Sequence, residues 1–90
     1  GRVRDEREFR EVVGRRVRLQ RQWLRMGQQQ VADAARVSRN FVSAIERGSQ
    51  GLDAWRLGLV ADALGVSVDW VLDRIPGPIT VPGPRPRPRL

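Results

Sequence analysis

The chain has 90 residues, enough for one small domain with a modest core. It contains no cysteine and no histidine, which excludes disulfides, zinc fingers and histidine general-base catalysis, so we expect no metal and no other cofactor. Its net charge is +7 and its basic residues are all arginine, which is typical of proteins that bind polyanions, although a solvated basic face gives the same value.

The positive charge lies at the two ends of the chain. Residues 1–27 carry nine arginines against four acids, residues 28–75 five against six, and residues 76–90 three against none. The change in composition at residue 76 marks a Pro/Gly/Arg-rich tail (76–90). We expect a folded domain before it (13–75), preceded by an N-terminal extension of the first helix (1–12).

No apolar run approaches the ~18 residues that a membrane span needs. The first residues also lack the apolar region of a signal peptide. We expect a cytoplasmic, nucleoid-associated protein with no membrane contact.

The first predicted helix covers about residues 5–24. Phe9, Val13 and Val17 recur every four residues and define one apolar face. Gly14 is a weak point inside this helix, costing about 1 kcal/mol relative to alanine. A close helix crossing at this position would explain it.

Two short helices follow, at about 28–35 and 39–47. Ser38 has the side chain and position of an N-cap for the second of them, and Gly48 is a C-terminal stop. Small alanines on the inward face of the first allow the pair to pack closely at a steep angle, as a helix-turn-helix requires.

A fourth helix is predicted from an N-cap at Asp53 to Leu64, where Gly65 stops it. Ser67 then caps a fifth helix over about 68–74. Strand-like alternation is not sustained anywhere, and the prolines of the tail prevent helix there. The predicted fold class is all-α, a compact five-helix domain with an extended Pro/Arg-rich tail.

The segment 28–48 resembles the helix-turn-helix of lambdoid phage repressors, Cro proteins and their Xre-type bacterial relatives. The resemblance covers about residues 13–73, and several motifs in register make it specific. The matching runs are Gln28 with Val31-Ala32, Val37-Ser38-Arg39, Ile45-Glu46-Arg47-Gly48, and Leu64-Gly65-Val66-Ser67-Val68-Asp69-Trp70-Val71-Leu72. It implies a repressor-like DNA-binding domain whose third helix enters the major groove by its N-terminal end.

The resemblance also implies which residues contact DNA. Arg39 would donate two hydrogen bonds to a guanine, Asn40 would pair with an adenine edge, and Ala44 would touch a thymine methyl. Arg47 stands at a family position that contacts phosphate. Gln28 stands at a position whose side chain contacts phosphate and also supports the side chain of Arg39. The full set of expected DNA-binding residues is Gln28, Gln29, Ser38, Arg39, Asn40, Ser43, Ala44 and Arg47.

Glu46 needs a separate interpretation, because an exposed acid beside DNA would repel phosphate. The resemblance places it inward, paired with Arg21 on the first helix. We expect this ion pair to be structural.

The sequence departs from the family pattern in two places. Gly27 stands where a hydroxyl N-cap is usual, and the loop after Gly48 lacks the usual basic residues. Arg15, Arg16 and Arg18 on the first helix are candidates to supply the missing phosphate contacts, and a solvated face is the alternative.

Several large apolar residues lie outside the expected core. On the first helix these are Val12, Leu19 and Trp23, and on the last two helices they are Trp55, Leu59, Val68 and Trp70. The second group is a candidate homodimer interface, which would set two recognition helices about 34 Å apart on a palindromic operator. The first group is a candidate site for the Pro-rich tail, and the tail or the tryptophans could also engage a protein partner.

These features predict a sequence-specific regulator of transcription that binds double-stranded DNA, with repression as the expected sign. The alternative is an antitoxin or another protein-interaction module whose DNA binding is secondary. An enzyme is not expected, because the chain has no His, Cys, Lys or Tyr and no carboxylate cluster or phosphate loop. RNA binding is disfavoured because the stacking aromatics of RNA-binding modules are missing.

Overall fold

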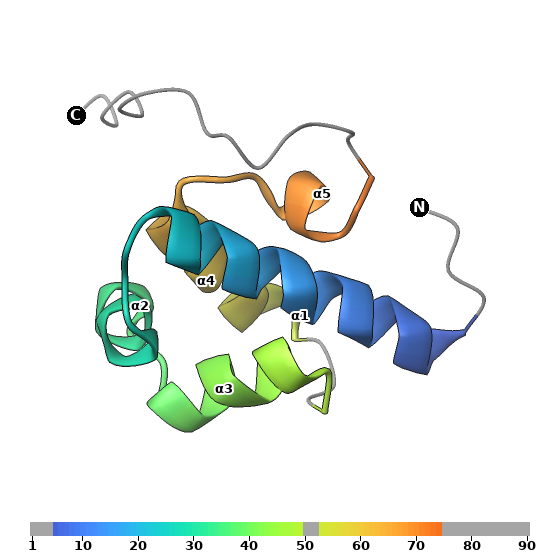
Figure 1. The fold of residues 1–90 in the computed structure, drawn as a ribbon, viewed down its shortest axis with the longest axis horizontal. Helices are drawn as coiled ribbons and strands as arrows, with labels where there is room; N and C mark the ends of the chain where they lie inside the picture. The colour runs from blue at the N-terminus through green and yellow to red at the C-terminus, as the bar shows by residue number, and fades with distance from the viewer. Residues whose placement is uncertain (1–4, 50–52, 75–90) are drawn as a thin grey trace.

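The computed structural model describes residues 5–49 and 53–74. In these two ranges the chain forms five α-helices (Figure 1). They are α1 (Glu6–Trp23), α2 (Gln28–Ala35), α3 (Arg39–Arg47), α4 (Ala54–Leu64) and α5 (Val68–Val71). The all-α prediction is confirmed, and α2 and α3 begin and end where the sequence places them. The predicted tail at 76–90 lies outside the described residues.

Polar side chains cap the starts of α3, α4 and α5, because the first backbone N–H groups of a helix have no partner within it. The hydroxyl of Ser38 accepts from the N–H of Phe41 at 3.0 Å, and that of Ser67 accepts from the N–H of Trp70 at 3.0 Å. The Asp53 carboxylate caps α4 in the same way. The three caps predicted from the sequence are therefore confirmed.

α2 begins without a side-chain cap, since Gly27 has no side chain to provide one. A side chain inside the helix caps the start instead, since the Gln30 side-chain oxygen accepts from the Gly27 N–H at 2.7 Å. This is one half of a capping box.

Left-handed residues end most of the helices. Gly48 and Gly65 close α3 and α4 with φ of 73° and 76°, a conformation that favours glycine. Arg36 adopts it after α2 with φ of 60°. α5 was expected to reach about residue 74 but ends at Val71, because the backbone turns left-handed at Asp73 with φ of 62°.

One hydrophobic core lies between the helices, and all five contribute to it. Its fully or almost fully buried side chains include the face predicted for α1 and the inward residues of the other helices. They are Val13, Val17, Val31, Ala32, Ala35, Phe41, Val42, Ile45, Leu57, Val60, Ala61, Leu64, Trp70 and Val71.

Gly14 is the point where α1 crosses α3. A β-carbon at this position would lie 2.3 Å from the carbonyl oxygen of Ile45 and 2.8 Å from that of Glu46. The close helix crossing expected at Gly14 is therefore present. One side of α3 therefore packs against α1, α2 packs near its start, and none of the described helices lies on the side of α3 that faces away from α1 (Figure 1).

Trp70 was expected outside the core, and that expectation is wrong. It is only 9% exposed and packs in the core cluster. The reason is a contact that local spacing does not reveal, since the Arg16 guanidinium of α1 lies 4.5 Å from the centre of the Trp70 ring. Of the other apolar residues expected outside the core, Leu59 and Val68 pack partly against it, while Trp55 is 76% exposed and Trp23 50%.

Candidate nucleic-acid interface

The recognition-helix candidate α3 presents one polar face away from the core. Its inward side is formed by Phe41, Val42 and Ile45, which are buried. Arg39 and Asn40 in its first turn are exposed. The predicted groove-facing side chains therefore share an accessible surface on a helix whose other side is fixed in the core.

The turn between α2 and α3 sets the angle of this face. The Arg36 N–H donates to the Asp33 carbonyl at 3.3 Å, and the Val37 N–H donates to the Ala32 carbonyl at 3.0 Å. Val37 also packs partly against the core. These contacts join α2 to α3 through a turn of three residues, closed by the left-handed Arg36 and the Ser38 cap.

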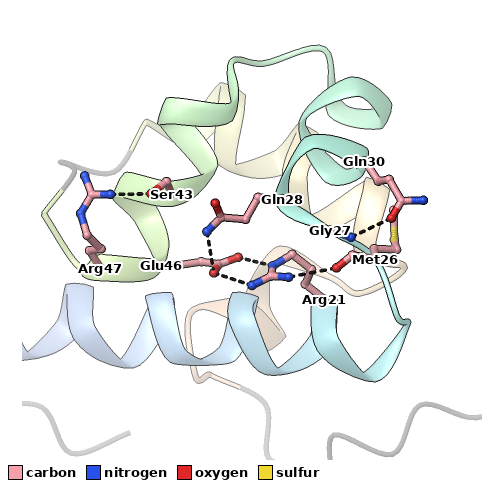
Figure 2. Close-up of polar contacts among 8 residues, drawn as sticks. All are labelled: Arg21, Met26, Gly27, Gln28, Gln30, Ser43, Glu46 and Arg47. Carbon is pink, nitrogen blue, oxygen red and sulfur yellow. Dashed lines mark hydrogen bonds and ion pairs between the residues drawn. The ribbon is translucent and has the colours of Figure 1, made fainter.

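The ion pair expected between Arg21 and Glu46 is present and has two contacts (Figure 2). Arg21 Nε donates to Glu46 Oε2 at 2.6 Å, and Arg21 Nη2 donates to Glu46 Oε1 at 3.0 Å. The Glu46 side chain is 5% exposed and that of Arg21 is 14% exposed. The hydrogen bond from Arg21 to Glu46 raises the pKa of the arginine above its ordinary value, so the guanidinium stays charged.

Two further bonds extend this pair into a cluster that links three helices. Arg21 Nη1 donates to the Met26 carbonyl at 2.9 Å, just before α2. The Gln28 side-chain nitrogen, in the first turn of α2, donates to Glu46 Oε1 at 3.1 Å. The cluster fixes the C-terminal part of α3 to both α1 and α2. The amide nitrogen of Gln28 is thus bound to Glu46 in the isolated protein, whereas the resemblance implies that Gln28 braces Arg39.

Two of the expected contact residues bond to each other on α3. Arg47 Nη1 donates to the Ser43 hydroxyl, one helical turn earlier (Figure 2). On α2, the Gln29 amide donates to the Asp33 carboxylate at 2.8 Å. Among the described residues, Arg39 forms no hydrogen bond or ion pair, so its guanidinium is free to meet a ligand.

Arg16 was a candidate phosphate contact, but the structure places it in the scaffold. Its guanidinium forms an ion pair with Asp73 at 3.2 Å and covers the Trp70 ring. Arg15 and Arg18 are exposed on α1. The long separation along the chain explains why spacing alone could not assign Arg16 to α5.

Sequence reasoning missed a contact between the first helix and the end of α3. Arg10 Nε donates to the Gly48 carbonyl at 3.0 Å, and its Nη1 pairs with Glu6 at 2.9 Å. The Glu6 to Arg10 spacing of four residues could have suggested the helical ion pair. No local signal indicated the bond to Gly48, 38 residues away.

Other kinds of site find no support in the part of the chain that the structure describes. No three or more His, Cys, Asp or Glu side chains are grouped there so as to hold a metal ion. None of its helices has both the length and the apolar character that crossing a membrane demands.

Comparisons with known proteins agree with this geometry. A family model described as a helix-turn-helix domain matches residues 12–72. A curated relative from Sinorhizobium fredii, named as an uncharacterized HTH-type transcriptional regulator y4aM, is 36% identical over 64 residues. That match covers 71% of this chain but 45% of the relative, so the chain spans about half the relative's length.

Two solved structures have the same arrangement of helices. The clp gene regulator ClgR from Corynebacterium glutamicum superposes with a TM-score of 0.68 at 35% identity, over 73% of this chain and 70% of that one. A hypothetical transcription factor NHTF from Neisseria gives a TM-score of 0.69 at 29% identity, over 80% and 83% of the two chains. Since the family model spans the described core from α1 to α5, the chain belongs to the Xre-like helix-turn-helix family.

Proposed function

We propose that this chain is the sequence-specific DNA-binding part of a transcriptional regulator, with α3 in the major groove of double-stranded DNA. One observation carries the proposal. Arg39 and Asn40 are exposed in the first turn of α3, while the opposite side of the same helix is packed into the core. A helix held in this way can enter the groove by its N-terminal end without rearranging the fold.

The chemistry of the exposed face suits base edges. A guanidinium donates two parallel hydrogen bonds to guanine, and a carboxamide both donates to and accepts from adenine. Arg39 and Asn40 would supply these two contacts, and Ala44 would give an apolar surface for a thymine methyl. We assign base reading to these residues together with Ser43.

The start of α2 is the proposed phosphate contact. Its first backbone N–H groups carry the positive end of the helix dipole, and Gln28 and Gln29 lie there. Ser38 holds the corresponding place at the start of α3. The side-chain nitrogen of Gln28 donates to Glu46. Gln28 would therefore contact DNA through its side-chain oxygen, or through its nitrogen after the side chain has rotated away from Glu46.

The proposed assembly is a homodimer on a palindromic operator, acting as a repressor in the cytoplasm. Trp55 carries the interface proposal, because its side chain is 76% exposed at the start of α4. Leu59 on α4 and Val68 on α5 also retain partly exposed surface, whereas Trp70 is buried in the core and is left out of the proposed interface. Sedimentation at increasing protein concentration, with and without DNA, tests this assembly, and a monomer in every condition would contradict it.

An enrichment experiment tests the DNA-binding proposal. Random duplex DNA is incubated with the chain, and bound molecules are separated and sequenced over several rounds. We expect a defined motif that contains a guanine, and we expect Arg39→Ala to weaken the preference for that guanine while Arg15→Ala, on exposed α1, leaves the motif intact. Recovery of unselected sequence by the wild type would contradict the proposal.

A second candidate function is a protein-interaction module such as an antitoxin. It is favoured by the exposed apolar side chains of α1, where Trp23 is 50% and Leu19 37% exposed. It would also be non-enzymatic. A motif that is recovered by the chain alone at nanomolar concentration favours the regulator, whereas DNA binding that appears only in the presence of a purified partner favours the module.

A further inference from the structure

Three residues of α3 point most directly away from the core, namely Asn40, Ser43 and Arg47. At about 100° per residue, the buried side chains Phe41, Val42 and Ile45 define a direction into the core. Ser43 and Arg47 lie within about 30° of the opposite direction on the same helical projection. Arg47 therefore belongs to the centre of the exposed face rather than to its edge.

Arg39 and Ala44 occupy the two edges of this face. In the same projection, each lies about 70° from the outward direction, one on either side. Asn40 lies near the centre, within about 35°. Around the helix, Arg47 therefore points between the directions of Arg39 and Ala44, and along the axis it lies about 12 Å from Arg39 toward the C-terminal end.

The side chain of Arg47 is directed back along α3 toward the residues of the first two turns. Side chains in a helix lean toward its N-terminus, so they cover the preceding turn. Arg47 follows this rule, because its Nη1 donates to the hydroxyl of Ser43 (Figure 2). Its positive charge consequently lies above the Ser43 turn and not beyond the end of the helix, where a phosphate contact would be made.

The contact leaves most of the guanidinium available. Arginine has five N–H donors, and Ser43 accepts from a single nitrogen. No acid neutralises the charge either, since Arg47 forms no ion pair within the part of the chain that the structure describes. A guanidinium held by one bond, with a second edge free, is preorganised for a two-pronged acceptor.

We propose that Arg47 reads a guanine in the major groove and that Ser43 is the positioning residue that turns its guanidinium toward the base. This inference rests on the proposed DNA-binding function and changes the role of Arg47, which the family resemblance assigns to phosphate. The acceptor is the O6 and N7 edge of a guanine at a base pair other than the one read by Arg39. Ser43 then acts through Arg47 instead of reading a base alone.

The test compares motifs enriched from random duplex DNA by the full chain and its variants. Arg47→Lys keeps the charge but loses the planar fork, so we expect the preference for guanine at one motif position to fall about 5- to 150-fold. Ser43→Ala should weaken the same position by a smaller factor, and Ser43→Thr, which keeps the hydroxyl, should restore it. Arg7→Lys, at an exposed position of α1 that forms a surface ion pair with Glu11, is the matched control and should leave every position unchanged.

The salt dependence of binding separates base reading from phosphate contact. If the inference is right, Arg47→Ala alters one position of the motif, and it leaves the affinity for non-specific duplex DNA and the slope of that log affinity against log salt nearly unchanged. If Arg47 contacts phosphate, Arg47→Ala lowers affinity equally for all sequences and reduces the slope by about one unit. That second result overturns the inference.

The two proposals fail in different ways. A wild-type motif that Arg47→Lys and Ser43→Ala leave unchanged overturns the role of Arg47 while DNA binding stands. A wild-type chain that enriches no motif overturns both. Circular dichroism of each variant confirms that the helices are intact, since Ser43 and Arg47 lie on the surface side of α3.

Discussion

Gly14 of α1 and Ile45 of α3 are in backbone contact, so close that a β-carbon on Gly14 would lie 2.3 Å from the Ile45 carbonyl oxygen. Two helices approach in this way only if the crossing residue has no side chain. The position of α3, and with it the position of the exposed reading face, depends on this contact. A methyl group here would push the recognition helix away from α1.

We expect Gly14→Ala to destabilise the protein, although alanine favours helix. The intrinsic gain of about 1 kcal/mol is outweighed by the overpacked crossing, which costs up to about 3 kcal/mol, for a net loss of up to about 2 kcal/mol in the free energy of unfolding. Urea denaturation measures it. Gly58→Ala on α4 is the matched control, because its β-carbon would meet only Val68 at 4.0 Å, and it should stabilise by about 0.5–1 kcal/mol. Equal effects of the two substitutions would contradict the crossing argument.

Glu46→Gln tests whether the Arg21 ion pair is structural. Removing one charge of a buried pair leaves the other uncompensated, and we expect a loss of about 3 kcal/mol in unfolding free energy. This is the lower end of the usual range, because Arg21 keeps some contact with water. Base preference should change less than stability.

A matched surface substitution provides the comparison for Glu46. Glu11→Gln removes a carboxylate whose pairing with Arg7, at 3.5 Å, is largely exposed, and it should cost at most about 0.5 kcal/mol. Unchanged thermal unfolding in Glu46→Gln would show that the buried pair does not stabilise the fold.

Asp53 should make the stability of α4 depend on pH. Hydrogen bonds from the Arg56 backbone and side chain lower the pKa of this carboxyl in the folded protein. A lowered pKa in the folded state stabilises the protein above the ordinary pKa of an aspartate, and this contribution is lost as the pH falls through that value toward the folded one. We expect Asp53→Asn to be less stable than the wild type at pH 7, and the difference should shrink as the pH falls below the ordinary pKa of an aspartate. A difference that persists at low pH would argue against the carboxylate as its source.

Replacing Arg36 by glycine should relieve the strain of its left-handed backbone conformation. A non-glycine residue with φ of 60° carries a steric cost of about 1 kcal/mol. Arg36→Gly and Arg36→Ala both remove the exposed guanidinium, so their difference isolates the backbone. We expect the glycine variant to be more stable than the alanine variant by about 1 kcal/mol in urea denaturation. The reverse order would mean that the lower backbone entropy of unfolded alanine dominates.

The sequence predicted α2 and α3 well because their ends carry local signals. Ser38 and Gly48 act through atoms only a few residues away, so their roles follow from residue type and position. The end of α5 was missed for the opposite reason, since Asp73 is a left-handed residue without the glycine that normally marks one.

The errors at the candidate site involve contacts between distant segments. Trp70 and Arg16 both have surface-like spacing in their own helices, yet each is sequestered by the other. Arg10 and Gly48 are bonded across 38 residues. By contrast, the pairing of Arg21 with Glu46 was expected only because the family resemblance supplied it. Helix periodicity gives the direction of a side chain but not which element it meets.

The Arg21, Gln28 and Glu46 cluster has a consequence for how this protein can change over evolution. It joins α1, α2 and α3 through a largely buried carboxylate and guanidinium. The exposed side chains Arg39 and Asn40 take no part in it. Substitutions at these exposed positions therefore leave the hydrogen bonds that hold the three helices together unchanged.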